Sequence, residues 1–166
     1  MSAACLVAIE IQDASGCEAL PAEESIRTWA THALGGDARG ELTIRIVSET
    51  ESADLNARYR GKPGSTNVLA FPSEAPSAAF ADGDLPPLGD LAICARVVAR
   101  EAGEQGKPLD AHWAHIVIHG VLHLLGYDHE TDSQALAMEA RERDLLAAFG
   151  VADPYQNRGQ TDVIGA

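Results

Sequence analysis

The chain has 166 residues, of which 46% are apolar and 22% are charged. This size and composition are typical of a single globular domain with its own core, so we do not expect extended disorder. The formal net charge of −13 argues against a protein that coats nucleic acid by bulk electrostatics, although a local basic groove is compatible with it.

The N-terminal sequence MSAACLVAIEI predicts a first strand and not a signal peptide, because no basic segment precedes its apolar run. No segment approaches the roughly 20 apolar residues that cross a bilayer, and we expect no membrane partner. The three cysteines are widely spaced and form no CxxC pair, which is typical of reduced thiols. We therefore predict a cytoplasmic protein.

The first half of the chain alternates strand and helix patterns. β-branched and alternating residues predict strands over 5–12 and 42–49. Between them, apolar residues from Ile26 to Ala33 recur at helical spacing after an acidic first turn, which predicts an amphipathic helix over 21–34. We then expect a short helix over 52–59, a turn-rich loop over 60–67 and a short apolar strand over 67–72.

The second half is richer in helix. We expect a mobile Pro/Ala/Asp-rich loop over 75–87, a strand over 88–94 and a helix over 95–106 that Gly106 closes. The longest helical pattern covers residues 108–126, with Pro108 in its first turn and Gly126 just past its end. A final helix is predicted over 132–149, with Asp132 or Ser133 as its N-terminal cap.

This order of elements predicts an α/β (α+β) fold. We expect a single compact domain over residues 1–155, in which a small mixed β-sheet packs with helices and the long helix is followed by a turn. Residues 156–166 are expected to form a disordered tail.

The segment HGVLHLLGYDH, residues 119–129, carries three histidines in an apolar context. His119 and His123 are four residues apart and so project from one face of a helix. Gly126 ends that helix and allows a turn that returns His129 toward the pair. Three imidazoles with an open fourth position are typical of catalytic zinc. This spacing favours a metal site over core histidines bonded to backbone carbonyls.

The same spacing occurs in the HExxHxxGxxH motif of metzincin proteases, with one difference. Gly120 stands where those proteases have their glutamate general base, so peptide hydrolysis is disfavoured. His112 and His115 share the helical face of His119, and we expect them to support the site or the core. Asp128 is read first as a turn residue; a partner of a metal ligand and a proton acceptor are the alternatives.

A cationic stretch precedes the histidines. Residues 55–72 contain Arg58, Arg60 and Lys62 and no acid. A guanidinium suits bidentate contact with phosphate, yet this stretch alone favours an exposed, solvated turn over a binding site. The neighbouring helix could widen the patch with Arg96, Arg100 and Lys107.

Three motifs together resemble the YbeY family of bacterial metal-dependent endoribonucleases. They are YRGKPGSTNVLAFP, LGDLAIC and HGVLHLLGYDH, and the resemblance extends over about residues 40–155, including GKPLDAHWAHIVIHG and ADPY. It implies a compact α/β domain in which one zinc ion is held by His119, His123 and His129. It also implies that Arg60 is the functional arginine of the substrate groove.

The resemblance further implies a function. The expected activity is single-strand-specific cleavage in the maturation of small-subunit rRNA, especially at its 3′ end, and in ribosome quality control. The expected partners are rRNA and the small ribosomal subunit, with ribosomal proteins or a ribosome-assembly GTPase as further partners. An acidic surface is compatible with basic ribosomal proteins.

Two other functions stay open. One is an atypical metzincin-like metalloprotease, and the other is a non-catalytic assembly factor that zinc only stabilises. Three imidazoles suit zinc but also nickel, copper or iron. The general base is likewise open: zinc-activated water could act alone, or Asp128 could assist it.

Overall fold

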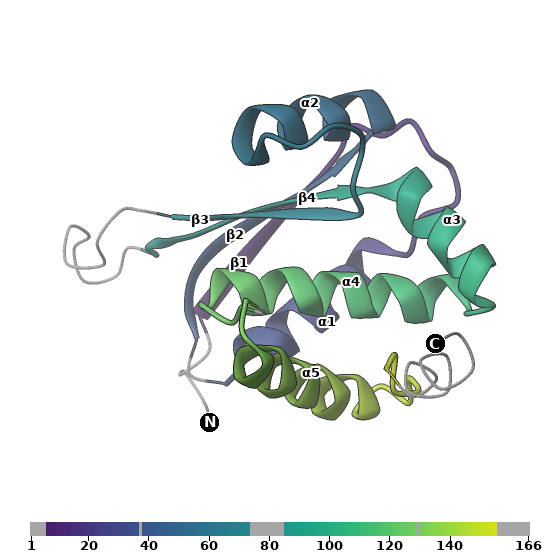
Figure 1. The fold of residues 1–166 in the computed structure, drawn as a ribbon. Helices are drawn as coiled ribbons and strands as arrows, with labels where there is room; N and C mark the ends of the chain where they lie inside the picture. Colours follow the sequence, from purple (N-terminus) through teal and green to yellow (C-terminus); the bar gives the residue numbers. More distant parts are fainter. Residues whose placement is uncertain (1–5, 37, 74–84, 129, 156–166) are drawn as a thin grey trace.

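The computed structural model describes residues 6–36, 38–73, 85–128 and 130–155 (Figure 1). Four strands and five helices follow one another along these residues. In chain order they are β1 (Leu6–Asp13), α1 (Glu23–Leu34), β2 (Arg39–Val47), α2 (Glu49–Arg60), β3 (Val68–Pro72), β4 (Pro87–Cys94), α3 (Ala95–Gln105), α4 (Leu109–Leu124) and α5 (Asp132–Ala147).

The strands form one mixed sheet in the order β1-β2-β4-β3. β1, β2 and β4 are parallel, whereas β3 pairs antiparallel with β4 at the edge of the sheet. Side chains alternate between the two faces, as the pleat requires. Leu91 and Ile93 of β4 join the main core, and Ala92 and Cys94 join a smaller apolar cluster on the other face.

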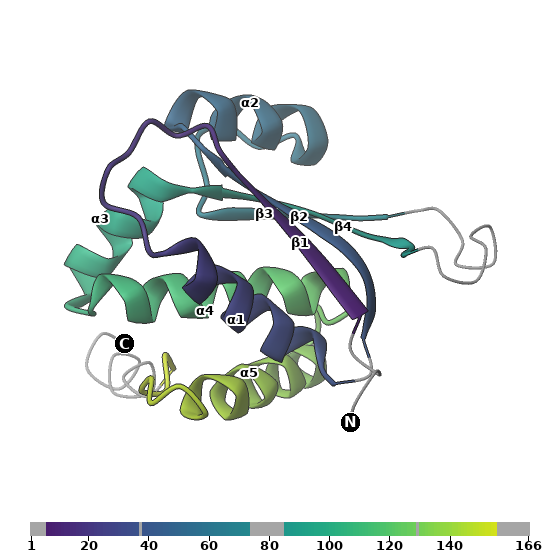
Figure 2. The same cartoon turned by 180° about the vertical axis from the view of Figure 1, so that it is seen from behind.

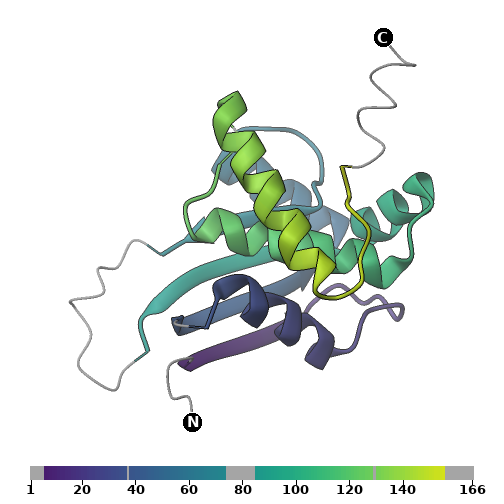
Figure 3. The ribbon, with the colours of Figure 1, turned by 90° about the horizontal axis from the view of Figure 1, so that it is seen from below.

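Helices cover the two faces unequally (Figures 1 and 2). α2 lies over the smaller apolar cluster, to which Val97 of α3 also contributes. α1 and α4 lie against the opposite face, and α5 packs on the side of α4 that is turned away from the sheet (Figure 3). α4 therefore runs between the sheet and α5, which places most of its residues inside the protein.

The central position of α4 follows from its sequence. Trp113, Val117, Ile118 and Val121 are fully buried, and apolar residues surround most of its circumference, as expected for a helix packed on several sides. Gly120 faces the sheet at its closest point. A Cβ there would lie 2.9 Å from Leu91 Cδ2 and 3.1 Å from Val68 Cγ2. The glycine therefore sets how closely α4 approaches β3 and β4.

The structure confirms the predicted α+β class and the order of its elements. Several boundaries differ from the prediction by a few residues, as in β2 (Arg39–Val47 and not 42–49), and three differences concern helix caps. α2 begins at Glu49 and not at residue 52, because the Ser48 side chain caps it by accepting from the Glu51 amide. Pro108 caps α4 from outside its first turn.

The third difference concerns α5, which neither Asp132 nor Ser133 caps. Thr131 does so, in a reciprocal capping box with Gln134. Most of the predicted 75–87 loop and the whole predicted 156–166 tail lie outside the described residues, and the 1–155 domain boundary stays a prediction. Over the described ranges, no helix combines the length and apolar character needed to cross a membrane.

We predict that Gly120→Val lowers the free energy of unfolding by about 2 kcal/mol, because the added atoms overpack the contact between α4 and the sheet. The matched control is Gly103→Val in α3, where an added Cβ meets nothing within 4 Å. There helix propensity alone predicts a change of no more than about 0.5 kcal/mol. Urea unfolding of both variants measures the difference, and equal midpoints would contradict the packing role of Gly120.

Candidate active site

A groove of about 610 Å³ opens where the end of α2, the edge strand β3 and α4 meet. Its walls bring together segments that are far apart in sequence. It is lined by Tyr59, Arg60, Thr66, Asn67, Val68, Leu69, Ala70, Phe71, Pro72, His119, Gly120, His123, Asp128 and Glu130. The predicted arginine and two of the three predicted histidines thus share one cavity.

The two histidines on α4 point their ring nitrogens at each other. His119 Nε2 and His123 Nε2 are 3.2 Å apart. Two nitrogens bound to one tetrahedral zinc at ordinary bond lengths would be about 3.3 Å apart. The pair therefore has the spacing of two ligands of one ion. The third predicted ligand, His129, lies outside the described residues.

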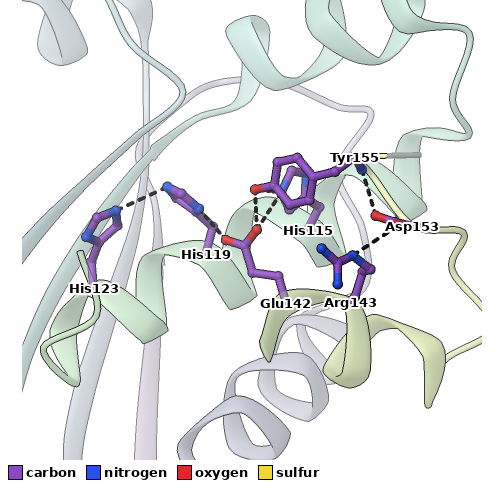
Figure 4. A network of polar contacts seen from close by, with 7 residues as sticks. All are labelled: His115, His119, His123, Glu142, Arg143, Asp153 and Tyr155. Atoms are coloured by element: carbon purple, nitrogen blue, oxygen red, sulfur yellow. Dashed lines mark hydrogen bonds and ion pairs between the residues drawn. The ribbon is translucent and has the colours of Figure 1, made fainter. Parts of the chain in front are cut away.

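A buried carboxylate on α5 holds the other nitrogen of His119 (Figure 4). Glu142 is 0% exposed, and its Oε2 is 2.5 Å from His119 Nδ1. Its Oε1 accepts from the Tyr155 hydroxyl and is 3.4 Å from His115 Nε2. Burial alone would raise the pKa of Glu142, but the hydrogen bonds and charges of His115 and His119 lower it to about 2.

The ionisation of Glu142 selects the tautomer of His119. A carboxylate only accepts hydrogen bonds, so His119 Nδ1 must carry the proton that it donates. In the neutral ring, Nε2 then keeps its lone pair, and Nε2 is the atom that faces His123. Histidines that bind metals commonly donate their other ring nitrogen to a carboxylate in this way.

A short turn after α5 brings Tyr155 to this carboxylate. Arg143 Nε lies 3.1 Å from Asp153 Oδ2, and Asp153 Oδ1 accepts from the Tyr155 amide at 2.8 Å. Figure 4 shows this turn beside α5, with the tyrosine ring directed at Glu142. The ADPY segment thus contributes to the surroundings of His119.

His115, His119 and Glu142 also form a group that could hold a metal ion, since their ligand atoms lie within 4.8 Å of one another. The distances favour hydrogen bonding instead. The 2.5 Å between His119 Nδ1 and Glu142 Oε2 is shorter than the roughly 3.3 Å expected between two ligands of one tetrahedral ion. Burial lowers the pKa of His115, against the raising effect of Glu142, and this favours the neutral ring in either arrangement.

The wall around Arg60 is tied to α2. Gly61 ends the helix in the left-handed conformation, with φ of 66°. The following loop is then fixed at two points: Asn56 Nδ2 donates to the Gly64 carbonyl at 2.9 Å, and the buried Ser52 hydroxyl bonds the amide and carbonyl of Thr66. The segment predicted as a solvated turn is therefore anchored beside the groove.

Comparison with known proteins identifies the family. The family model described as "Endoribonuclease YbeY" matches residues 11–150. The chain belongs to the YbeY family. Two relatives named "Endoribonuclease YbeY", from Stenotrophomonas maltophilia strains R551-3 and K279a, are each 56% identical over 137 residues, covering 82% of this chain and 85% of each relative.

A solved structure agrees at the level of the fold. The solution structure of TM1509 from Thermotoga maritima superposes with a TM-score of 0.51 at 22% identity, covering 87% of this chain and 91% of that one. The YbeY resemblance read from the three sequence motifs is thus confirmed, and the family is one of endoribonucleases.

In this YbeY chain, some of the cations near the groove are paired with carboxylates and others are not. Arg58 pairs with Asp54 and Arg100 with Glu49, so neither widens the patch as a free cation. Arg60 lines the groove with no carboxylate partner among the described residues. Burial lowers the pKa of Lys107, despite the acids near it.

Sequence reasoning missed two acids of this YbeY site. Glu101 accepts from Asn67 at 3.1 and 3.2 Å and lies 2.9 Å from the buried His112, so it fixes an amide on the groove wall. Burial would raise the pKa of Glu101, but these hydrogen bonds lower it. Glu142 did carry a signal, since it shares the buried face of α5 with Met138, Leu145 and Leu146.

Proposed function

We propose that this chain is a single-strand-specific, metal-dependent endoribonuclease that acts in small-subunit rRNA processing, at the 3′ end, and in ribosome quality control. The observation that supports it most directly is that Arg60, His119 and His123 line one groove. A cation suited to phosphate beside a pair of metal-binding nitrogens is the arrangement that phosphodiester hydrolysis needs.

The proposed cofactor is one zinc ion held by His119, His123 and His129. The 3.2 Å between the two described nitrogens and the hydrogen bond that leaves His119 Nε2 unprotonated support this choice. When bound, zinc supplies a water of lowered pKa and polarises a phosphoryl oxygen. Glu142 keeps His119 in the ligating tautomer throughout.

Arg60 would bind the scissile phosphate and stabilise the negative charge that grows on its oxygens. Its position at the end of α2, next to the anchored loop, places it on the wall of the groove. Position 120 cannot supply a general base, because its side-chain direction is occupied by Leu91 and Val68. Asp128 lines the groove and is the carboxylate we propose as proton acceptor.

The same packing argues against the protease alternative. The Cβ of a glutamate at position 120 would lie 2.9 Å from Leu91 Cδ2 and 3.1 Å from Val68 Cγ2. These contacts are too close, so the site has no room for the glutamate base of the metzincins. The non-catalytic alternative makes a different prediction, namely that metal-loaded protein leaves RNA intact. We further propose a cytoplasmic location and partners of the small ribosomal subunit, including ribosomal proteins or an assembly GTPase. The net charge of −13 favours binding to basic ribosomal proteins.

A graded series tests the metal site. His123→Ala should lose bound zinc, because it removes a ligand. Glu142→Gln should weaken zinc binding by about 10- to 100-fold, because it removes the acceptor that orients His119. Asp144→Asn, an exposed change on the same helix, is the control and should bind as the wild type. Competition with a chromophoric chelator measures all three affinities.

The series also separates the two groups of candidate ligands. If the ion were held by His115, His119 and Glu142, His115→Ala would lose zinc and His123→Ala would keep it. That result would overturn the assignment of His123.

Arg60→Gln should lower cleavage of an unstructured RNA by about 100-fold or more, because a donor to the developing charge is lost. Zinc content should not change. Arg58→Gln is the matched control, since Arg58 is two residues away but pairs with Asp54 outside the groove. Cleavage that is equal in both variants would remove Arg60 from the reaction, and a wild type that is inactive with zinc would support the non-catalytic alternative.

The cellular role has its own test. Cells without this protein should accumulate small-subunit rRNA with extended 3′ ends, and the wild-type chain should restore the mature end while His123→Ala should not. Sequencing of the rRNA ends measures this. Mature ends in the deletion strain would place the substrate elsewhere.

A further inference from the structure

Tyr59 is a large aromatic residue that the fold leaves open to solvent. It is 63% exposed, although it occupies the last turn of α2 immediately before Arg60. Its ring makes a T-shaped contact with the ring of Phe71 in β3, with centroids 5.1 Å apart and an interplanar angle of 72°. Phe71 thus supports part of the Tyr59 ring, while most of the residue's surface faces solvent.

Tyr59 also stands where two grooves meet. A second groove of about 710 Å³ lies over the α2 face of the sheet and shares Tyr59, Ala70, Phe71 and Pro72 with the groove that contains the histidines. A strand of nucleic acid that passes from the first groove to the second would therefore run past Tyr59 and the shared residues of β3.

Both grooves carry acids, but their cations differ. The first is lined by Asp128, Glu130 and Arg60, and Arg60 has no carboxylate partner among the described residues. In the second, Arg45 is neutralised by two hydrogen bonds to Glu51, at 2.6 and 3.1 Å, and Asp90 adds a further acid. The one cation that lines the second groove in the described part of the chain is thus already paired, so this groove is poorly suited to a phosphate but can accept an uncharged base, for which Thr43 on its wall offers a hydroxyl.

We propose that Tyr59 is a stacking platform for one unpaired RNA base, that of the nucleotide next to the phosphate bound by Arg60. This subsite rests on the proposed endoribonuclease function. Stacking on an aromatic face is the usual way in which proteins hold unpaired bases, and it requires the base to be free of a duplex. The subsite thus gives a physical basis for single-strand specificity.

The test measures binding of fluorescein-labelled A12 and U12 RNA to the full chain, and cleavage of an unstructured RNA by the zinc-loaded chain. Loss of one stacked base costs about 1–3 kcal/mol, so Tyr59→Leu should weaken A12 binding by about 5- to 150-fold. Tyr59→Phe and Tyr59→Trp keep a ring and should stay within about threefold of the wild type. A purine stacks better than a pyrimidine, so the preference for A12 over U12 should shrink in Tyr59→Leu.

Leu136→Ala is the control, because Leu136 is 64% exposed on α5 and lines neither groove. It should bind and cleave as the wild type, and thermal melting should show that all variants are folded. If Tyr59→Leu binds RNA as tightly as the wild type, or if Tyr59→Phe is as weak as Tyr59→Leu, base stacking is refuted while the nuclease activity stands. A wild type that neither binds nor cleaves single-stranded RNA would overturn the subsite together with the proposed function.

Discussion

The close contact between α4 and the sheet is the constraint on which the candidate site depends. Gly120 removes the side chain that would otherwise separate the helix from Leu91 and Val68. As a result, His119 and His123, on either side of this glycine in sequence, reach the edge strand β3 and share a groove with Arg60. A helix held one side chain further away would carry the same histidines without bringing them to the groove.

A buried acid, Glu142, completes this arrangement at an energetic cost that its partners offset. An isolated carboxylate is strongly disfavoured in a protein interior. Glu142, which is fully buried, is stabilised by contacts from His115, His119 and Tyr155. These contacts satisfy the hydrogen-bonding capacity of the carboxylate in only one arrangement of its neighbours. Glu142 therefore fixes the orientation of the His119 ring.

The parts of the site that the sequence predicts are those that depend on local periodicity. His119 and His123 follow from their spacing on one helix, and their convergence is confirmed by the 3.2 Å contact; the metal itself stays a proposal. Arg60 is predicted only from the resemblance to the YbeY family, since the run of cations by itself favours a solvated turn. The partners of Glu142 and Glu101 could not be read this way, since His119 is 23 residues from Glu142 and Asn67 is 34 from Glu101. Such pairs arise only when α3, α4, α5 and β3 pack together.

The anchoring of the Arg60 loop by Ser52 and Asn56 could not be predicted for a different reason. In a short helix the sequence pattern does not distinguish a buried polar residue from an exposed one.

The position of Tyr155 and Glu142 in the chain has a consequence for biosynthesis. Both residues are made after the histidine segment: Glu142 accepts from Nδ1 of His119, and the Tyr155 hydroxyl donates to Glu142. During translation, His119 and His123 emerge from the ribosome before the residues that orient them. The order of synthesis therefore delays assembly of the complete site until α5 and the turn after it have been made and have folded onto α4, so a chain that has not yet reached Glu142 has the histidines without their fixed geometry.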